Sequence, residues 1–191
     1  MQKNYTSLGL MSGTSGDGVD ASLVKSNGID KFQTIRDKYF QYDSSIYDGI
    51  HNLKEKIYHF KDLNKYQKEI NELTRKITIF HAKVINEFKL SDQDTLVGFH
   101  GQTIYHNAGE KISYQLGDGR LLNQLSKKKI IFDFRKKDIL NGGDGAPITP
   151  IFHQLFATQK KIKLPVCIFN IGGISNATII KGPIGSLKIF S

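Results

Sequence analysis

The 191-residue sequence contains a single cysteine and no tryptophan. One cysteine, Cys167, excludes an internal disulfide and any zinc site built on cysteines. It lies in an apolar run, residues 166–169, so we interpret it as a small buried hydrophobic residue. No stretch approaches the roughly 18 consecutive apolar residues of a membrane span, and Gly9 and Gly13 interrupt the N-terminus too early for a signal-peptide core. We therefore expect a cytoplasmic protein with no membrane partner.

Arginine is also scarce, although the formal net charge is +9. Of the 27 basic residues, four are arginine and the rest are scattered lysines, densest at residues 127–129 and 135–137. Proteins that read bases favour arginine forks and clustered basic stripes. We expect no nucleic-acid partner, because a basic protein that binds an anionic nucleotide explains the charge more simply.

The spacing of apolar residues predicts alternating strands and helices. Strands are expected at residues 8–11, 19–24, 32–40, 95–99, 129–134 and 165–171, with a further hairpin strand from 174 to 180. One long helix is expected over residues 62–88, where apolar residues recur in steps of three and four, and another over 147–159. This pattern indicates a mixed α/β sheet covered by helices.

The first candidate site is the glycine-rich segment at residues 13–20. Its glycines allow backbone N–H groups to point at one anion, and Thr14, Ser15 and the preceding Ser12 add hydroxyl donors. Asp17 and Asp20 could hold Mg²⁺ directly or through water. No Gly-Lys-Ser/Thr follows, so this is not a Walker A loop. The alternative is a glycine-rich hairpin with acidic turn residues, but the composition favours phosphate binding.

The second candidate is the segment of residues 98–106, expected at the end of a strand, where α/β proteins place ligands. His100, Gln102 and Thr103 offer hydrogen-bonding groups of the kind a sugar needs. A zinc site with His106 matches no metal signature, and a histidine satisfied within the fold is the stronger alternative. Residues 115–120, ending at Arg120, read as a turn that leads into a helix.

Two further segments carry candidate chemistry. Asp133 ends an apolar strand between two phenylalanines and could act as a general base, although a salt bridge with Arg135 explains it equally well. Residues 142–145 resemble a helix entry, where free N–H groups attract anions. Residues 169–176 repeat the pattern of strand, glycines and strand seen in the opening segment. This repetition suggests that two related halves of the protein face one nucleotide.

Together these segments resemble the anhydro-N-acetylmuramic acid kinase family, within the actin–Hsp70–hexokinase superfamily. The matching blocks are residues 9–21, 98–106, 115–122, 133–150 and 170–176. The resemblance implies an α/β, actin/hexokinase-like (ribonuclease H-like) mixed sheet flanked by helices. It assigns residues 1–164 to the first lobe and residues 165–191 to the start of a second, nucleotide-binding lobe.

The resemblance also implies a reaction and its residues. ATP and Mg²⁺ would be the cofactors, and an amino sugar would be the substrate: water opens its 1,6-anhydro bridge while O6 takes the γ-phosphoryl group, giving N-acetylmuramic acid 6-phosphate in cell-wall recycling. Asp133 would be the catalytic base, and His100, Gln102, Thr103 and Arg120 would bind the sugar. Asp17 and Asp20 would bind the metal. The ATP-binding residues would be Gly13, Thr14, Ser15, Gly16, Asp17, Gly18, Val19 and Asp20, with Gly172 and Gly173 from the second hairpin.

The chain departs from the family pattern at two residues and in length. Gly16 stands where the family usually has a larger residue, and Asp144 stands where it usually has glutamine. Family members are considerably longer, so we expect a shortened kinase that needs a C-terminal lobe in cis or in trans. An inert lobe that binds sugar or a partner chain is the alternative. The family often forms homodimers.

Overall fold

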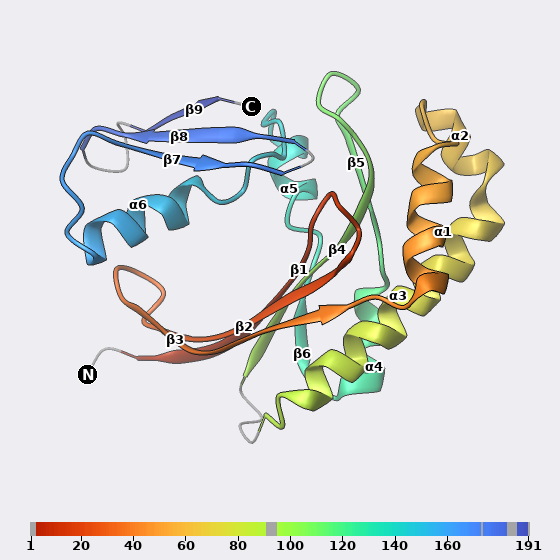
Figure 1. Cartoon of the computed structure of the whole chain (residues 1–191), viewed down its shortest axis with the longest axis horizontal. Helices are drawn as coiled ribbons and strands as arrows, with labels where there is room; N and C mark the ends of the chain where they lie inside the picture. The colour runs from red at the N-terminus through yellow and green to blue at the C-terminus, as the bar shows by residue number, and fades with distance from the viewer. Residues whose placement is uncertain (1–2, 91–94, 173, 183–186, 191) are drawn as a thin grey trace.

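The computed structural model describes residues 3–90, 95–172, 174–182 and 187–190 (Figure 1). The chain opens with an antiparallel meander of three strands: β1 (Tyr5–Ser12), β2 (Gly18–Ser26) and β3 (Phe32–Gln41). Alternate residues of β1, among them Leu8 and Leu10, are buried, which is the period of a strand with one covered face. All three predicted strands of this region are confirmed.

The central strand of the first sheet is β4 (Leu96–Asn107). It runs parallel to β1 and to the short strand β6 (Lys129–Ile131), and its second half pairs antiparallel with β5 (Ile112–Leu116). The strand order is β3-β2-β1-β4-β5, with β6 also beside β4. Since β1, β4 and β6 are parallel, their carboxyl ends meet at one edge of the sheet.

Four helices lie together on one face of this sheet, on the right of Figure 1. They are α1 (Ser44–Lys54), α2 (Phe60–Lys65), α3 (Gln67–Glu87) and α4 (Gly119–Ser126). The helix expected over residues 62–88 is confirmed from Gln67 to Glu87, but it is not continuous, because Tyr66 has non-helical backbone angles and separates α2 from α3. Helix α1 and strand β5 were not predicted.

Helix α1 begins after Asp43, whose side chain accepts a hydrogen bond from the backbone N–H of Ile46. Its buried residues, Ile46, Ile50 and Leu53, form the apolar stripe that faces the core. Ile50 packs against the glycine loop, as we call residues 13–17, at Gly16. A Cβ on Gly16 would lie 2.8 Å from Ile50 Cγ2, and Gly16 has a φ of +67°. Glycine therefore lets α1 lie in direct contact with the loop.

His81 of α3 is a titratable core residue whose side chain is fully buried. Its ring packs edge-on against Phe99, with centroids 4.9 Å apart, and Nδ1 lies 2.8 Å from the carbonyl oxygen of Ile77. The Nε2 atom has no hydrogen-bond partner among the described residues. Burial lowers the pKa of His81 to about 4, so the imidazole is neutral at physiological pH.

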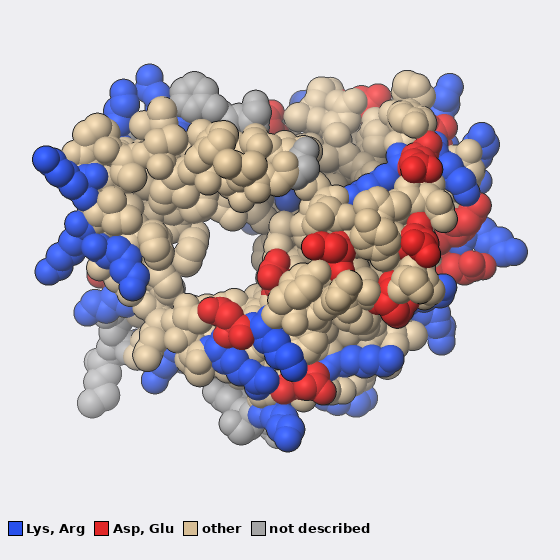
Figure 2. Space-filling view, in the orientation of Figure 1, with Lys and Arg blue, Asp and Glu red and all other residues tan. Residues whose placement is uncertain are grey.

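The C-terminal part forms a second, three-stranded antiparallel sheet of β7 (Val166–Asn170), β8 (Asn176–Ile180) and β9 (Lys188–Phe190). Helix α5 (Lys136–Leu140) precedes it, and α6 (Pro150–Gln159) packs on it, with His153 Nδ1 2.9 Å from Thr178 Oγ1. The amide of Gln159 ties α6 back to β3 by pairing with both backbone groups of Phe32, at 2.8 and 2.9 Å. Figure 2 shows an opening between this part and the first sheet.

One sequence prediction about this second sheet is wrong. Cys167 is exposed, not buried. Phe169, two residues later, is 60% exposed, so one face of β7 has no cover among the described residues. An apolar run predicts a strand, but it does not reveal which face is covered.

Acid should destabilise the fold through His81. The folded state holds this imidazole neutral down to about pH 4, whereas the unfolded chain binds a proton below about pH 6.5. Stability should therefore fall as pH drops from 6.5 towards 4, by about 2 kcal/mol from this residue between pH 7 and pH 5. Urea denaturation of wild type and His81→Leu at both pH values tests this: the variant should lose about 2 kcal/mol less. Equal losses would contradict the assignment.

The contact at Gly16 predicts a cost for any larger residue there. Gly16→Ala introduces a side chain at positive φ and against Ile50, and should destabilise the chain by more than about 1 kcal/mol. Gly28→Ala is the matched control, because Gly28 has a φ of +74° and nothing within 4 Å of the added Cβ. Urea denaturation should show the larger loss for Gly16→Ala. Equal losses would show that Ile50 moves away freely.

Candidate functional site

The glycine loop joins β1 to β2 and exposes polar groups at its tip. A turn closes it, with the N–H of Gly16 donating to the carbonyl of Gly13 at 3.1 Å. The Ser15 hydroxyl donates to an Asp17 carboxylate oxygen at 2.5 Å, and this bond is the main reason that the pKa of Asp17 is lowered. Thr14, Ser15 and Asp17 are all exposed. The loop thus presents hydroxyls beside an ionised carboxylate.

A buried network holds the loop from below. The Ser12 hydroxyl donates to Gln102 Oε1 at 2.5 Å, and Gln102 Nε2 donates to the Gly13 carbonyl at 2.9 Å. The Tyr42 hydroxyl in turn donates to Ser12 Oγ at 3.1 Å, and burial raises the pKa of Tyr42, so this hydroxyl keeps its proton. Gln102, expected at the sugar, is fully buried and engaged in fixing the loop to β4.

A second polar pair joins His100, two residues before Gln102 on β4, to Arg135, the residue before α5. Arg135 Nε donates to His100 Nε2 at 3.0 Å, so the ring proton is on Nδ1, which donates to the Gly101 carbonyl at 2.8 Å. Burial and the Arg135 charge lower the pKa of His100 to about 4. Arg135 Nη1 also donates to the Gly145 carbonyl at 2.6 Å. The pair therefore fastens the loop of residues 142–145, and His100 is satisfied within the fold.

Asp133 follows β6 in a left-handed conformation, with a φ of +60°. The two phenylalanines beside Asp133 lie against glycines. A Cβ on Gly119 would meet the Phe132 ring, and one on Gly98 would meet the Phe134 ring. Asp133 itself is exposed, so the two rings do not bury it, and no ion pair joins it to Arg135 among the described residues. It borders a hollow of about 420 Å³ that is also lined by Tyr114, Gln115 and Lys136.

The sheet brings Asp133 and the glycine loop to the same edge. Strands β1 and β6 flank β4 and run parallel to it, so their carboxyl ends point the same way. With neighbouring strands about 4.8 Å apart, the two segments follow strands roughly 10 Å apart.

The remaining predicted site residues are more dispersed. Thr103 is half-buried and accepts a hydrogen bond from Gln115 Nε2 at 3.2 Å, while Arg120 is exposed on the first turn of α4. Val19 is fully buried in the core, so only its backbone could meet a ligand. Asp20 is exposed on β2, Gly18 is buried beside Tyr39, and Gly172 is exposed after β7. Gly173 lies outside the described residues.

Two residues of this region escaped the sequence analysis, Tyr42 and Lys54. Lys54 lies at the end of α1 and donates a hydrogen bond to the Thr14 carbonyl. The apolar spacing of Ile46, Ile50 and Leu53 behind the capping residue Asp43 was the signal that could have located this helix. Nothing in the sequence indicates the contact with Thr14, which is 40 residues away.

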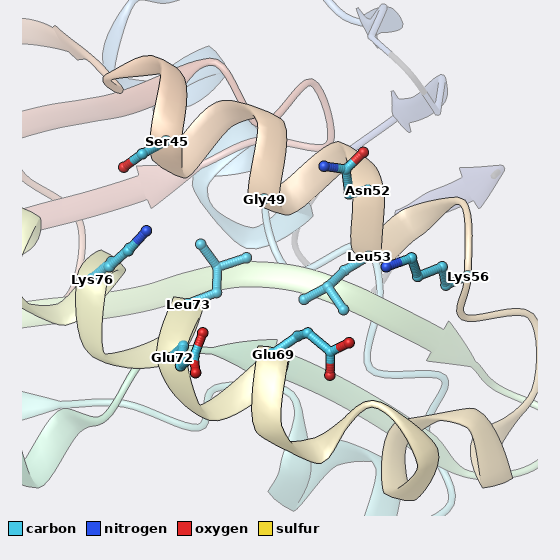
Figure 3. Close-up of a pocket in the computed structure, with 9 residues that line it drawn as sticks. All are labelled: Ser45, Gly49, Asn52, Leu53, Lys56, Glu69, Glu72, Leu73 and Lys76. Carbon is cyan, nitrogen blue, oxygen red and sulfur yellow. The ribbon is translucent and has the colours of Figure 1, made fainter.

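A separate hollow of about 200 Å³ lies between α1 and α3 (Figure 3). Leu53 and Leu73 form its floor, and Glu69 and Glu72 on α3 balance Lys56 and Lys76. None of the predicted site residues lines it. This mixed surface shows no preference for an anion or a cation.

No helix among the described residues is long and apolar enough to cross a membrane. The family model described as anhydro-N-acetylmuramic acid kinase matches residues 5–186. Curated relatives carry the same name. One from Pelagibacter ubique is 57% identical over 94% of this chain and 48% of its own length, and one from Gluconobacter oxydans is 35% identical over 91% and 47%. One from Rhizobium etli is 33% identical over 97% of this chain and 51% of its own length.

The chain thus spans about half the length of the curated relatives that it matches. The glycine loop, the histidine and glutamine of β4 and Asp133 all fall inside the matched residues. With its mixed sheet flanked by helices, the chain belongs to the anhydro-N-acetylmuramic acid kinase family.

Proposed function

We propose that this chain forms the first lobe of a kinase that phosphorylates 1,6-anhydro-N-acetylmuramic acid at the expense of ATP. Water opens the anhydro ring in the same reaction, and the product is N-acetylmuramic acid 6-phosphate, an intermediate of peptidoglycan recycling in the cytoplasm. The relatives' printed name supports the kinase. The observation that carries the proposal is the glycine loop, fixed by Gln102 at the sheet edge where Asp133 lies.

The glycine loop is proposed to bind the phosphates of ATP. Its exposed Thr14 and Ser15 hydroxyls and its backbone N–H groups are donors suited to phosphate oxygens. Because Gln102 and Tyr42 fix the loop before any ligand arrives, the donors need little reorganisation on binding. Gly172 and Gly173 would face the nucleotide from the second hairpin.

The residues fit a magnesium ion that arrives with the nucleotide. Asp17 is exposed and ionised, and Mg²⁺ typically takes one or two carboxylates together with substrate phosphates and water. Within the described residues no cluster of three acidic, histidine or cysteine side chains could hold a metal unaided. Bound there, Mg²⁺ would neutralise charge on the transferring phosphoryl group. Asp20 is the second candidate ligand.

Asp133 is proposed as the general base. Its carboxylate would take a proton from the water that attacks the anomeric carbon, while the bond from that carbon to O6 breaks and O6 takes the γ-phosphoryl group. The exposed side chain is open to solvent and to a sugar at the sheet edge. Thr103 and Arg120 are proposed sugar contacts from the neighbouring β4 and α4. His100 and Gln102 act on the sugar through the loops that they fix.

A phosphoryl-transfer assay tests the activity directly. It should be run on residues 1–191 and on the same chain extended by the second half of the Pelagibacter ubique relative, with anhydromuramic acid set against ordinary hexoses. We expect turnover of the anhydro sugar by the extended chain. One other candidate is an inert lobe that binds sugar or a partner chain, such as a second copy of itself. Sugar binding without turnover in both forms would support it.

Asp133→Asn should abolish most turnover while leaving ATP binding intact. Loss of a general base of this kind typically lowers the rate by about 10² to 10⁴. Asp48→Asn is the matched control, because it removes another exposed carboxylate, on α1 and outside the candidate site, and should keep turnover within a few-fold. Steady-state kinetics and calorimetry on the extended chain measure both effects. Turnover near the wild-type rate in Asp133→Asn would refute the base.

A further inference from the structure

Lys54 reaches the glycine loop from α1. Its ammonium donates a hydrogen bond to the Thr14 carbonyl, at the exposed tip of the loop. One turn earlier, Ile50 packs against Gly16 of the same loop. Helix α1 therefore contacts the loop at two points, and the cationic end of Lys54 lies at the backbone of the tip that carries Thr14 and Ser15.

Lys54 forms no ion pair among the described residues. Among the described residues no carboxylate is within ion-pair distance of its nitrogen, and its one hydrogen bond is to a neutral carbonyl. The side chain is half-buried, and burial lowers the pKa of its ammonium. An ammonium has three N–H donors, so two are left after the bond to Thr14. Partial burial of a cation is costly without an anion nearby.

We infer that Lys54 binds the terminal phosphate of the nucleotide held by the glycine loop. This inference rests on the proposed function of the loop and names a residue on an element outside it. A phosphate beside Thr14 and Ser15 would supply the anion that Lys54 lacks. The lysine would also offset the negative charge of Asp17, which the Ser15 hydrogen bond keeps ionised at the same tip.

The simpler role for Lys54 is a tether, in which the bond to Thr14 holds the loop and no ligand is involved. The two roles differ in what the charge does. If Lys54 is a tether, its removal changes the stability of the loop. If Lys54 binds phosphate, its removal weakens anion binding, and a bound anion shifts the titration of its ammonium. Measurements on the loop and on the Lys54 ammonium separate them.

The experiment is a titration of the labelled 191-residue chain with inorganic tripolyphosphate, followed by NMR of the loop amides and of the lysine side chains. Wild type should show binding at residues 13–18. Lys54→Met should bind about tenfold more weakly, which is the worth of one charge-assisted hydrogen bond. Lys61→Met is the matched control, since it makes the same charge change at an exposed site on α2 and should bind within twofold of wild type.

In wild type the anion should also raise the pH at which the Lys54 signal titrates. If Lys54→Met proves unfolded by circular dichroism, this shift and the affinity of Lys54→Arg decide the question. Equal affinity in Lys54→Met and wild type, or an unmoved Lys54 titration with a bound loop, overturns the inference and leaves the proposed function standing. Loop amides that do not respond in wild type at millimolar tripolyphosphate overturn the inference, whereas the proposed function stands or falls with turnover by the extended chain.

Discussion

The site depends on one buried amide. The amide oxygen of Gln102 accepts a hydrogen bond from the Ser12 hydroxyl, and its amide nitrogen donates one to the Gly13 carbonyl. The side chain therefore joins the central strand, β4, to the loop that follows β1. Since Gln102 is fully buried, loss of either partner would leave an unsatisfied polar group, at a cost of about 1–3 kcal/mol. The loop thereby shares the rigidity of β4. The same strand fastens residues 142–145 through His100 and Arg135, so β4 positions both glycine-rich loops.

The spacing of apolar residues predicted those strands and helices whose signal lies within one short segment of the sequence. The opening hairpin and β3 were located correctly, because alternation of apolar residues reports a half-covered strand. The break at Tyr66 was missed because its neighbours keep the helical spacing on both sides. The exposure of Cys167 was missed because burial depends on what packs against β7. Each error concerns packing or backbone conformation that residue spacing does not encode.

The site residues show the same limit. Sequence identified His100 and Gln102 as polar groups in an apolar strand, and both do lie next to the loops. Their partners, however, are separated by 35 and 89 residues, so the sequence could not show that their hydrogen bonds are already made within the protein. Lys54 is the converse case. It lay in an unremarked helix, and only the tertiary structure brings its charge to Thr14.

The polar side chains around the site have two roles, which their hydrogen bonds distinguish. One group forms hydrogen bonds within the protein and so holds the scaffold: Gln102, Tyr42, His100 and Arg135. The other group can still offer hydrogen bonds or charge to a ligand at one edge of the sheet: Thr14, Ser15, Asp17, Asp133 and Lys54. An exposed carboxylate and exposed donors act weakly on a ligand in bulk water, because solvent competes for every hydrogen bond. Their chemistry therefore requires a cover that excludes water. The uncovered face of β7, with Phe169 at 60% exposure, is an apolar surface on which a further part of such a cover could pack.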